Sequence, residues 1–406
     1  MSRGIAIATF FYLAHIFCAG WIASSELGVV LLIGTLIVLI WRGEIRPSFH
    51  ILCFPLFIYA LDSSISSFAN GASTHAFGEI ALWLKCLLFP AALILFRNVP
   101  RTRELALKTF LAFGVFSSLY GFVQYFALHQ RDLEHRITGP AAHVMTYSGL
   151  MLPVALMFLI LWVHERRNLW LLGGTIMTTM TLLMTFTRSA WLGWLVAVLV
   201  LAALKRPRLL AYAVPAGILV ITFLPLPYFA RLMSTFDTRQ SSNFDRIRMF
   251  EGGVEIIKDF PVLGVGPGNM KEVYPLYRKP DAPRFRIPHL HNNLVQLWAE
   301  RGIVALASYI ALIALFLREC ARGWRSKYAE LGVAVTVGLV IAGMFEFNFG
   351  DTEVFLAMLD VFALVIAFTE GEGVRGAPLP VRAHRVRPPG NEEVPAAVAQ
   401  LQTAGP

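Results

Sequence analysis

The stretch from about Pro227 to Arg301 holds most of the side chains in this very apolar chain that could move a proton or bind an anion. Its acid–base chemistry centres on His289 and His291, because an imidazole titrates near pH ~6.5 and can take or give a proton at neutral pH. Several arginines share the stretch, and the planar guanidinium fork matches phosphate oxygens in a way that a lysine cannot. These residue types indicate proton transfer on an anionic, phosphate-bearing ligand.

The two histidines are two positions apart, so on a helix their side chains would point about 200° away from each other and could not share a metal ion. An extended segment would leave a metal site open, but we expect none. Pro288 precedes the pair and an apolar helix is predicted to follow Asn292, which places both histidines at a helix entry. A buried structural role remains an alternative there, and we favour a general base or hydrogen-bond donor.

Two arginines could hold a phosphate. Arg188 separates two apolar runs with almost no loop between them, so it either reaches toward lipid headgroups or faces a bound phosphate. Arg246 falls in the first turn of an amphipathic helix predicted over 246–260, where its charge opposes the helix dipole but free backbone N–H groups can hold an anion. The apolar positions that predict this helix are Ile247, Phe250, Val254 and Ile257.

The composition places these residues on a membrane protein. With 56% hydrophobic and 15% charged residues and a mean hydropathy of +0.62, the chain is too apolar for a soluble protein of this size. Long unbroken apolar runs select helices of about 20 residues over a barrel. The four cysteines are not spaced as CxxC, which predicts neither a disulfide framework nor a zinc site.

We predict an all-α polytopic fold with about twelve transmembrane helices and a long loop that contains short amphipathic helices. The first span is kept as a span rather than a secretory signal, because it is long and lacks a small-x-small cleavage site. The spans are 5–23, 26–41, 49–69, 79–97, 105–128, 141–163, 169–187, 189–204, 209–225, 300–318, 329–349 and 353–370. The chain then divides into spans one to nine (1–225), the loop (226–300), spans ten to twelve (301–370) and a disordered tail (371–406).

Basic residues set the orientation. Lys or Arg follows every even-numbered span, whereas the short connections near Ser24, Asn70 and Gly350 carry none, so both termini and the tail are expected to be cytoplasmic. The long loop then faces away from the cytoplasm, together with Arg136 and Asp351. Asp62 and Lys85 lie inside apolar spans and either pair structurally, reach a wet cavity or touch substrate.

Two further features of the loop allow more than one interpretation. The run from Gly264 to Asn269 could cradle phosphate with its N–H groups, but we favour a plain reversal between helices. A mixture of rings and cations follows it, with Arg278, Lys279, Arg284 and Arg286 as the basic members. Nucleic acid is implausible on that side of the membrane, so an anionic glycan or the anionic membrane surface is expected there.

The motifs resemble those of the O-antigen ligase and polymerase family, whose members share a Wzy_C region. The resemblance covers most of the chain. It rests on Thr187-Arg188-Ser189, Arg246 with Phe250, Pro261-x-x-Gly264-x-Gly266-Pro267-Gly268-Asn269, His289-x-His291-Asn292-x-x-x-Gln296-x-x-x-Glu300-x-Gly302, and Arg136-x-x-Gly139. Phe250, where such proteins often carry Trp, and Pro140 after Gly139 depart from the pattern.

Within this family the length and the twelve spans look most like the lipopolysaccharide O-antigen ligases (WaaL type). The resemblance implies a GT-C-like, inverting, metal-independent transferase without a cofactor in the inner membrane of a Gram-negative bacterium. It would move a glycan from undecaprenyl diphosphate to lipid A-core oligosaccharide at the periplasmic face, among membrane lipids. An O-antigen polymerase or a protein O-oligosaccharyltransferase is the alternative, and a transporter of the same lipid is a more distant one.

The expected catalytic residues are His291 as the base for the acceptor hydroxyl, with Arg188 and Arg246 stabilising charge on the leaving diphosphate. Other residues are expected to orient these groups or to bind substrate. They are His289, Arg136, Arg248, Arg278, Lys279, Arg284, Arg286 and Asp351.

Overall fold

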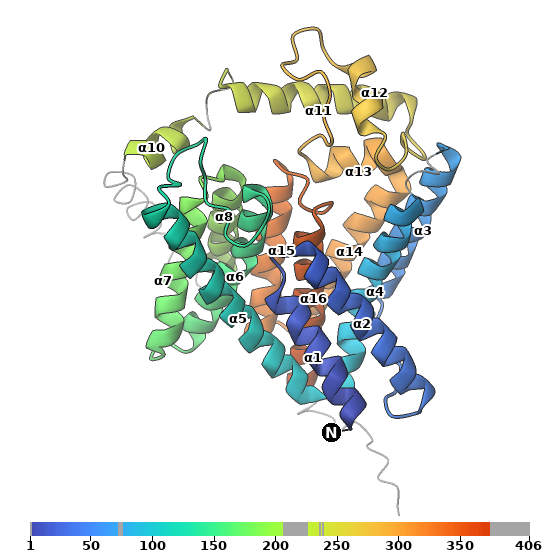
Figure 1. Ribbon diagram of the computed structural model, residues 1–406, viewed down its shortest axis with the longest axis vertical. Coiled ribbons are helices and arrows are strands. Elements are labelled where there is room, and N and C mark those ends of the chain that lie inside the picture. The colour runs from blue at the N-terminus through green and yellow to red at the C-terminus, as the bar shows by residue number, and fades with distance from the viewer. Residues whose placement is uncertain (1, 72–75, 206–225, 235–236, 238, 374–406) are drawn as a thin grey trace, which may run out of the picture.

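The computed structural model describes residues 2–71, 76–205, 226–234, 237 and 239–373, and these form a helical bundle with a helical layer at one end (Figure 1). The bundle helices are α1 (Arg3–Phe17), α2 (Ile22–Trp41), α3 (Cys53–Ala69), α4 (Ala76–Asn98), α5 (Pro100–Phe122) with the π-helical turn η2 (Val123–Ala127), α6 (Val144–His164), α7 (Leu169–Met184), α8 (Arg188–Lys205), α14 (Ile303–Arg322), α15 (Lys327–Gly343) and α16 (Thr352–Gly373). The layer contains α10 (Leu226–Met233), α11 (Ser241–Asp259), α12 (Met270–Tyr277) and α13 (Asn293–Arg301).

The protein is an all-α polytopic membrane protein, as predicted. In the described part of the chain, 7 helices are long and apolar enough to cross a bilayer, and α1, α3 and α7 are shorter apolar helices. α6 and α16 lie at the centre, because most of their residues are buried inside the bundle. Each predicted span except 209–225 corresponds to a helix, and 209–225 lies outside the described residues.

The start of α1 and the end of α16 lie at the same end of the bundle. Arg97 at the end of α4 forms an ion pair with Glu370 near the end of α16, and Arg103 at the start of α5 donates to the Ala367 carbonyl. The helical layer covers the opposite end, where α11 runs across the bundle (Figure 1). We call this layer, residues 226–234, 237 and 239–301, the cap.

The cap has an apolar core of its own. α11 packs over α12 and α13 through Gly252 and Gly253, where an added Cβ would lie 2.9 Å from the Tyr274 ring and 2.6 Å from Val295. The core residues are Met249, Ile256, Val265, Met270, Tyr274, Ile287, Leu290, Val295 and Ala299. The two glycines therefore permit close packing in a helix that they would otherwise weaken.

The helix predicted over 246–260 is present but begins earlier, at Ser241, so the prediction that Arg246 lies in the first turn beside free N–H groups is wrong. The predicted apolar face is also not the buried one. Met249 and Ile256 are buried, while Ile247 and Phe250 are exposed at the layer surface. A cap between a bilayer and water need not bury all its apolar residues, since some can meet the membrane surface.

Several span boundaries differ from the prediction, and two of them lie at the end of the bundle that the cap covers. The span predicted at 300–318 begins at Ile303, because Gly302 adopts φ +93° and separates α13 from α14; a Cβ there would lie 1.8 Å from the Val262 carbonyl oxygen. The span predicted at 329–349 ends at Gly343, and residues 344–350 form an irregular turn. Most of the predicted disordered tail, from residue 374 onward, lies outside the described residues.

Candidate active site

A polar cavity of about 530 Å³ opens between the cap and the end of the bundle. Its lining comes from segments far apart in sequence: the connection before α6, helices α10 and α11, the loop before α13, and the turn after α15. Its ionisable lining residues are Arg136, His143, Arg231, Asp245, Arg246, Arg284, His289, His291, Glu346 and Asp351. We call it the arginine cavity.

The loop that carries both histidines is fixed to the turn after α15. Asn292 caps α13 by accepting from the N–H groups of Leu294 and Val295, and its Nδ2 donates to the Met344 carbonyl at 2.9 Å. The Nδ2 of Asn293 donates to Oδ1 of Asn348 at 2.7 Å. These bonds place the turn opposite the histidines.

Two later residues of the histidine motif, Gln296 and Glu300 in α13, support the same loop through hydrogen bonds. The side chain of Gln296 accepts from the Leu290 N–H at 2.7 Å and donates to Glu300 at 3.0 Å. Glu300 in turn accepts from the Gly268 N–H at 2.7 Å. The spacing from His291 to Gly302 therefore reflects one hydrogen-bonded support beneath the histidines.

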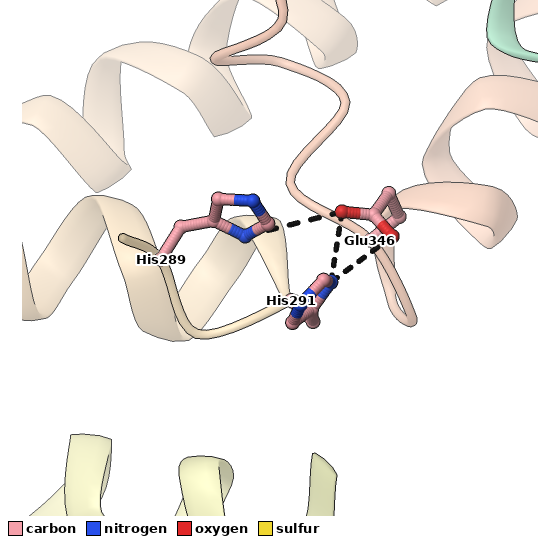
Figure 2. A group of neighbouring side chains, drawn as sticks. All are labelled: His289, His291 and Glu346. Atoms are coloured by element: carbon pink, nitrogen blue, oxygen red, sulfur yellow. Dashed lines mark hydrogen bonds and ion pairs between the residues drawn. The ribbon is translucent and has the colours of Figure 1, made fainter. Parts of the chain in front are cut away.

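Glu346 is the point at which the two segments meet (Figure 2). Nδ1 of His291 lies 2.9 Å and 3.0 Å from the two carboxylate oxygens of Glu346, and Nδ1 of His289 lies 3.9 Å from the nearer one. The rings of His289 and His291 are 4.3 Å apart. His291 also has φ +51°, an uncommon value for a residue other than glycine. A conformation of this kind persists only where its surroundings fix it, which is frequent at functional sites.

The ionisation of this cluster is shifted from ordinary values. Burial, with the positive charge that His291 can carry, lowers the pKa of His289 to about 4. Burial would raise the pKa of Glu346, but its hydrogen bond with His291 and the nearby His289 and Arg246 lower it to about 2. At neutral pH the cluster thus holds a carboxylate next to a neutral His289.

Three buried or half-buried guanidiniums converge on the same cavity. Arg246 reaches Glu346, with Nη2 3.6 Å from the carboxylate oxygen. Burial, together with the charges of Arg188, Arg136 and Arg246, lowers the pKa of Arg231 to about 10. Burial and the charge of Arg246 also lower the pKa of Arg136, whose Nη1 is buried without a hydrogen-bond partner in the described residues. Cations outnumber acids here, and a bound anion would relieve their repulsion.

Arg188 lies beside this group rather than in the cavity lining. Its guanidinium donates to the side chains of Ser234 at 3.1 Å, Ser242 at 3.0 Å and Asn243 at 2.6 Å. The contacts tie the start of α8 to Ser234, just after α10, and to the first turn of α11. Among the described residues, Arg188 therefore orients the helix that carries Arg246. Its positive charge also helps to lower the pKa of Arg231, which lines the cavity.

The remaining predicted residues divide into two groups. Asp351 lines the cavity and accepts from the Thr146 hydroxyl, and Arg284 lines it while pairing with Asp245 at 3.0 Å. Four other residues belong to the cap but are absent from the lining formed by the described part of the chain. They are Arg248, which pairs with Glu251 and Asp281; Arg278, which donates to the Ala282 carbonyl; Arg286, which pairs with Glu272; and Lys279.

The structure also answers two questions left open by the sequence. The N–H groups of Val265, Gly266 and Gly268 are already bonded to Ala299 and Glu300, so the glycine run is a reversal against α13. Lys85 pairs with Glu26 at 3.2 Å and donates to Thr352. Oδ2 of Asp62 is buried with no hydrogen-bond partner in the described residues.

Sequence reasoning missed Glu346, Arg231 and His143. Glu346 was hidden inside a predicted apolar span, although an acid near the end of such a span is a signal in itself. Arg231 was one of many arginines in the loop, and nothing in its spacing marked it. His143 caps α6 by accepting from the Met145 N–H, and it is the third imidazole at the cavity.

Comparison with known proteins supports the motif-based resemblance. The family model Wzy_C, described as O-Antigen ligase, matches residues 173–310. That range includes α8, the cap and the start of α14. No curated protein matches this chain.

Proposed function

With residues 173–310 identified as a Wzy_C region of the O-antigen ligase family, we propose that this protein is a membrane-bound glycosyltransferase that moves a glycan from a polyprenyl diphosphate to lipid A-core oligosaccharide. The observation that carries the proposal is the arginine cavity, where Arg136, Arg231 and Arg246 surround a space next to His291 and Glu346. A diphosphate is the natural anion for such a group of guanidiniums.

In the proposed reaction an acceptor hydroxyl attacks C1 of the donor sugar from the side opposite the diphosphate. The C1–oxygen bond to the diphosphate breaks, a new C1–oxygen bond forms, and the configuration at C1 inverts. His291 takes the hydroxyl proton through Nε2, because Glu346 holds its Nδ1. Glu346 is a positioning residue, and the guanidiniums stabilise the charge that develops on the leaving oxygen without a metal.

The decisive experiment is reconstitution of the purified protein with a polyprenyl-diphosphate glycan and lipid A-core. We expect glycan on the lipid A-core, and His291→Ala should lower kcat by about 10² to 10⁴. His135→Ala is the matched control, since His135 is exposed in the connection before α6 and pairs with Asp132. Full activity of His291→Ala would remove the proposed base.

The same assay separates the alternatives. A polymerase would lengthen the lipid-linked donor glycan and leave lipid A-core unmodified, and a protein O-oligosaccharyltransferase would modify serine or threonine in a protein acceptor. A transporter would move the lipid between leaflets and form no glycosidic bond.

We also propose that the cavity faces the periplasm of a Gram-negative inner membrane and that both termini are cytoplasmic. The asymmetry of basic residues supports this orientation. Single cysteines in a chain whose native cysteines are replaced by serine would test it. A membrane-impermeant maleimide should label Leu276→Cys on α12, which is 80% exposed, from the periplasmic side, and Arg42→Cys after α2 only once the membrane is opened.

A further inference from the structure

Two imidazoles and one carboxylate point toward a common position at the edge of the arginine cavity (Figure 2). One donor atom each of His289, His291 and Glu346 lies within 4.8 Å of the other two. Nδ1 of His291 and Nδ1 of His289 are 2.9 Å and 3.9 Å from the same oxygen, Oε1 of Glu346. Ligand atoms around a tetrahedral Zn²⁺ stand roughly 3.4 Å apart, since its bonds are about 2.1 Å long. The two nitrogen–oxygen distances, 2.9 Å and 3.9 Å, lie on either side of that value.

The donor set also suits such an ion. Two neutral imidazoles and a carboxylate form a recurrent ligand set of Zn²⁺ and related first-row ions. Nδ1 of His289 is buried and has no hydrogen-bond partner in the described residues. A buried polar nitrogen normally has a partner, and a metal ion would provide one.

Hydrogen bonds between two chain segments hold the three ligands in place without an ion. His289 and His291 belong to the loop before α13, Glu346 belongs to the turn after α15, and Asn292 and Asn293 bond the two segments together. The sequence objection to a shared metal assumed a helix through both histidines, whereas the helix begins at Asn293.

The charge of the surroundings limits the affinity. Nη2 of Arg246 lies 3.6 Å from Oε2 of Glu346, so the arginine and the ion would share one carboxylate. Arg136 and Arg231 add repulsion toward a cation. We therefore expect weaker binding than at a structural zinc site, with a Kd on the order of micromolar.

We infer that His289, His291 and Glu346 form a site for one divalent transition-metal ion such as Zn²⁺, and that this ion reversibly blocks glycan transfer. The second clause rests on the proposed function. An ion bound at Nδ1 of His291 leaves the proton of the neutral ring on Nε2. That nitrogen then has no lone pair with which to accept the proton of an acceptor hydroxyl.

Binding is measured on the full-length protein in detergent, purified without a polyhistidine tag, by titrating Zn²⁺ in a calorimeter and Co²⁺ by its visible absorption. We expect one saturable ion per chain, with at least tenfold weaker binding in His289→Ala and in Glu346→Gln. His143→Ala is the matched control, because His143 lines the same cavity outside the three ligands, and it should bind as the unmodified protein does. Equal binding by all three variants, or no saturable binding, would overturn the site.

Inhibition is measured in the reconstituted transfer reaction. Saturating Zn²⁺ should lower the rate at least tenfold, EDTA should restore it, and EDTA alone should change nothing. Undiminished or increased transfer with the site filled would overturn the block while leaving the binding site established. The calorimetric arm needs no activity, so a protein that binds Zn²⁺ but transfers no glycan would refute the proposed function and not the metal site.

Discussion

Two regions at the same end of the bundle contain buried guanidinium groups. They differ in whether neighbouring carboxylates balance the positive charge. In the first, the arginine cavity, four lining arginines outnumber three lining acids; they are Arg136, Arg231, Arg246 and Arg284 against Asp245, Glu346 and Asp351. In the second, which we call the Arg301 anchor, Arg301 lies between Glu79 at 3.5 Å and Glu300 at 3.8 Å. Glu79 also accepts from Ser63 of α3, so the anchor joins the cap to α3 and α4.

The pKa shifts follow this difference. Burial alone would lower the pKa of Arg301, but Tyr59, Glu300 and Glu79 raise it above its usual value. Burial and neighbouring arginines lower the pKa of Arg136 and of Arg231. A buried arginine with its counter-charges already in place serves the fold, whereas an unbalanced group of arginines is prepared for an anion from outside.

The sharpest test of this contrast is Arg246→Ala. We expect glycan transfer to fall by about 10² to 10³, because a donor to the developing charge is removed. Thermal stability should change little, since weaker repulsion among the arginines offsets the lost ion pair with Glu346, which keeps its hydrogen bond with His291. Arg322→Ala, at the exposed opposite end of α14, is the control for both measurements. A large loss of stability in Arg246→Ala would place that arginine with the anchor.

Arg301→Met should show the reverse. Removing one partner of a buried ion pair leaves Glu79 and Glu300 uncompensated, which costs about 3–5 kcal/mol of stability. Thermal unfolding in detergent should detect this, with the half-exposed Arg318 replaced by Met as the control. The specific activity of the folded fraction should change only a few-fold. If Arg301→Met kept its stability and lost glycan transfer, Arg301 would act in the reaction and not in the fold, and the contrast between the two regions would be wrong.

Inorganic pyrophosphate offers a test without the glycan. At ten times its Kd it should stabilise the unmodified protein by about 1.4 kcal/mol, because it binds only the folded state. The gain should disappear in Arg231→Ala and persist in Arg322→Ala, as read from the shift in unfolding temperature. Equal protection of both variants would mean that pyrophosphate binds elsewhere.

The smallest expected effect concerns Asp351, the acid at the cavity edge. Burial raises its pKa above the ordinary value despite the hydrogen bond from Thr146. The folded state therefore holds a proton more tightly than the unfolded state, so stability falls as pH rises through the interval above about 4. Asp351→Asn should remove this decline and raise the unfolding temperature slightly at pH 7 but not at pH 4. An identical pH dependence in both proteins would contradict it.

Hydropathy alone could predict most of the helices and the polar segment, because a bilayer forces long apolar runs on the sequence. The types and spacing of His291, Arg246, Arg136 and Asp351 were enough to predict residues that the structure brings to one cavity.

The rest depended on contacts between segments that are distant in the chain. Glu346 meets His291 across 55 positions, and the helix before it ends early where Asn348 bonds to Asn293 and to Leu339. Arg188 was recognised by its place between two apolar runs, but its partners just after α10 and in the first turn of α11 could not be predicted from that place. The basic residues Arg278, Lys279 and Arg286 looked equivalent to Arg284, because sequence does not show which basic side chains of a loop reach the cavity.

The separate core of the cap has a consequence for how such a protein could diversify. Met249, Ile256 and Tyr274 keep the layer folded by contacts within itself, so the stretch 278–283 after α12, which is not part of the cavity lining described above, can change without disturbing the helices in the membrane. New acceptor preferences could then arise by exchanging a short surface stretch, while the residues that face the cavity are inherited unchanged.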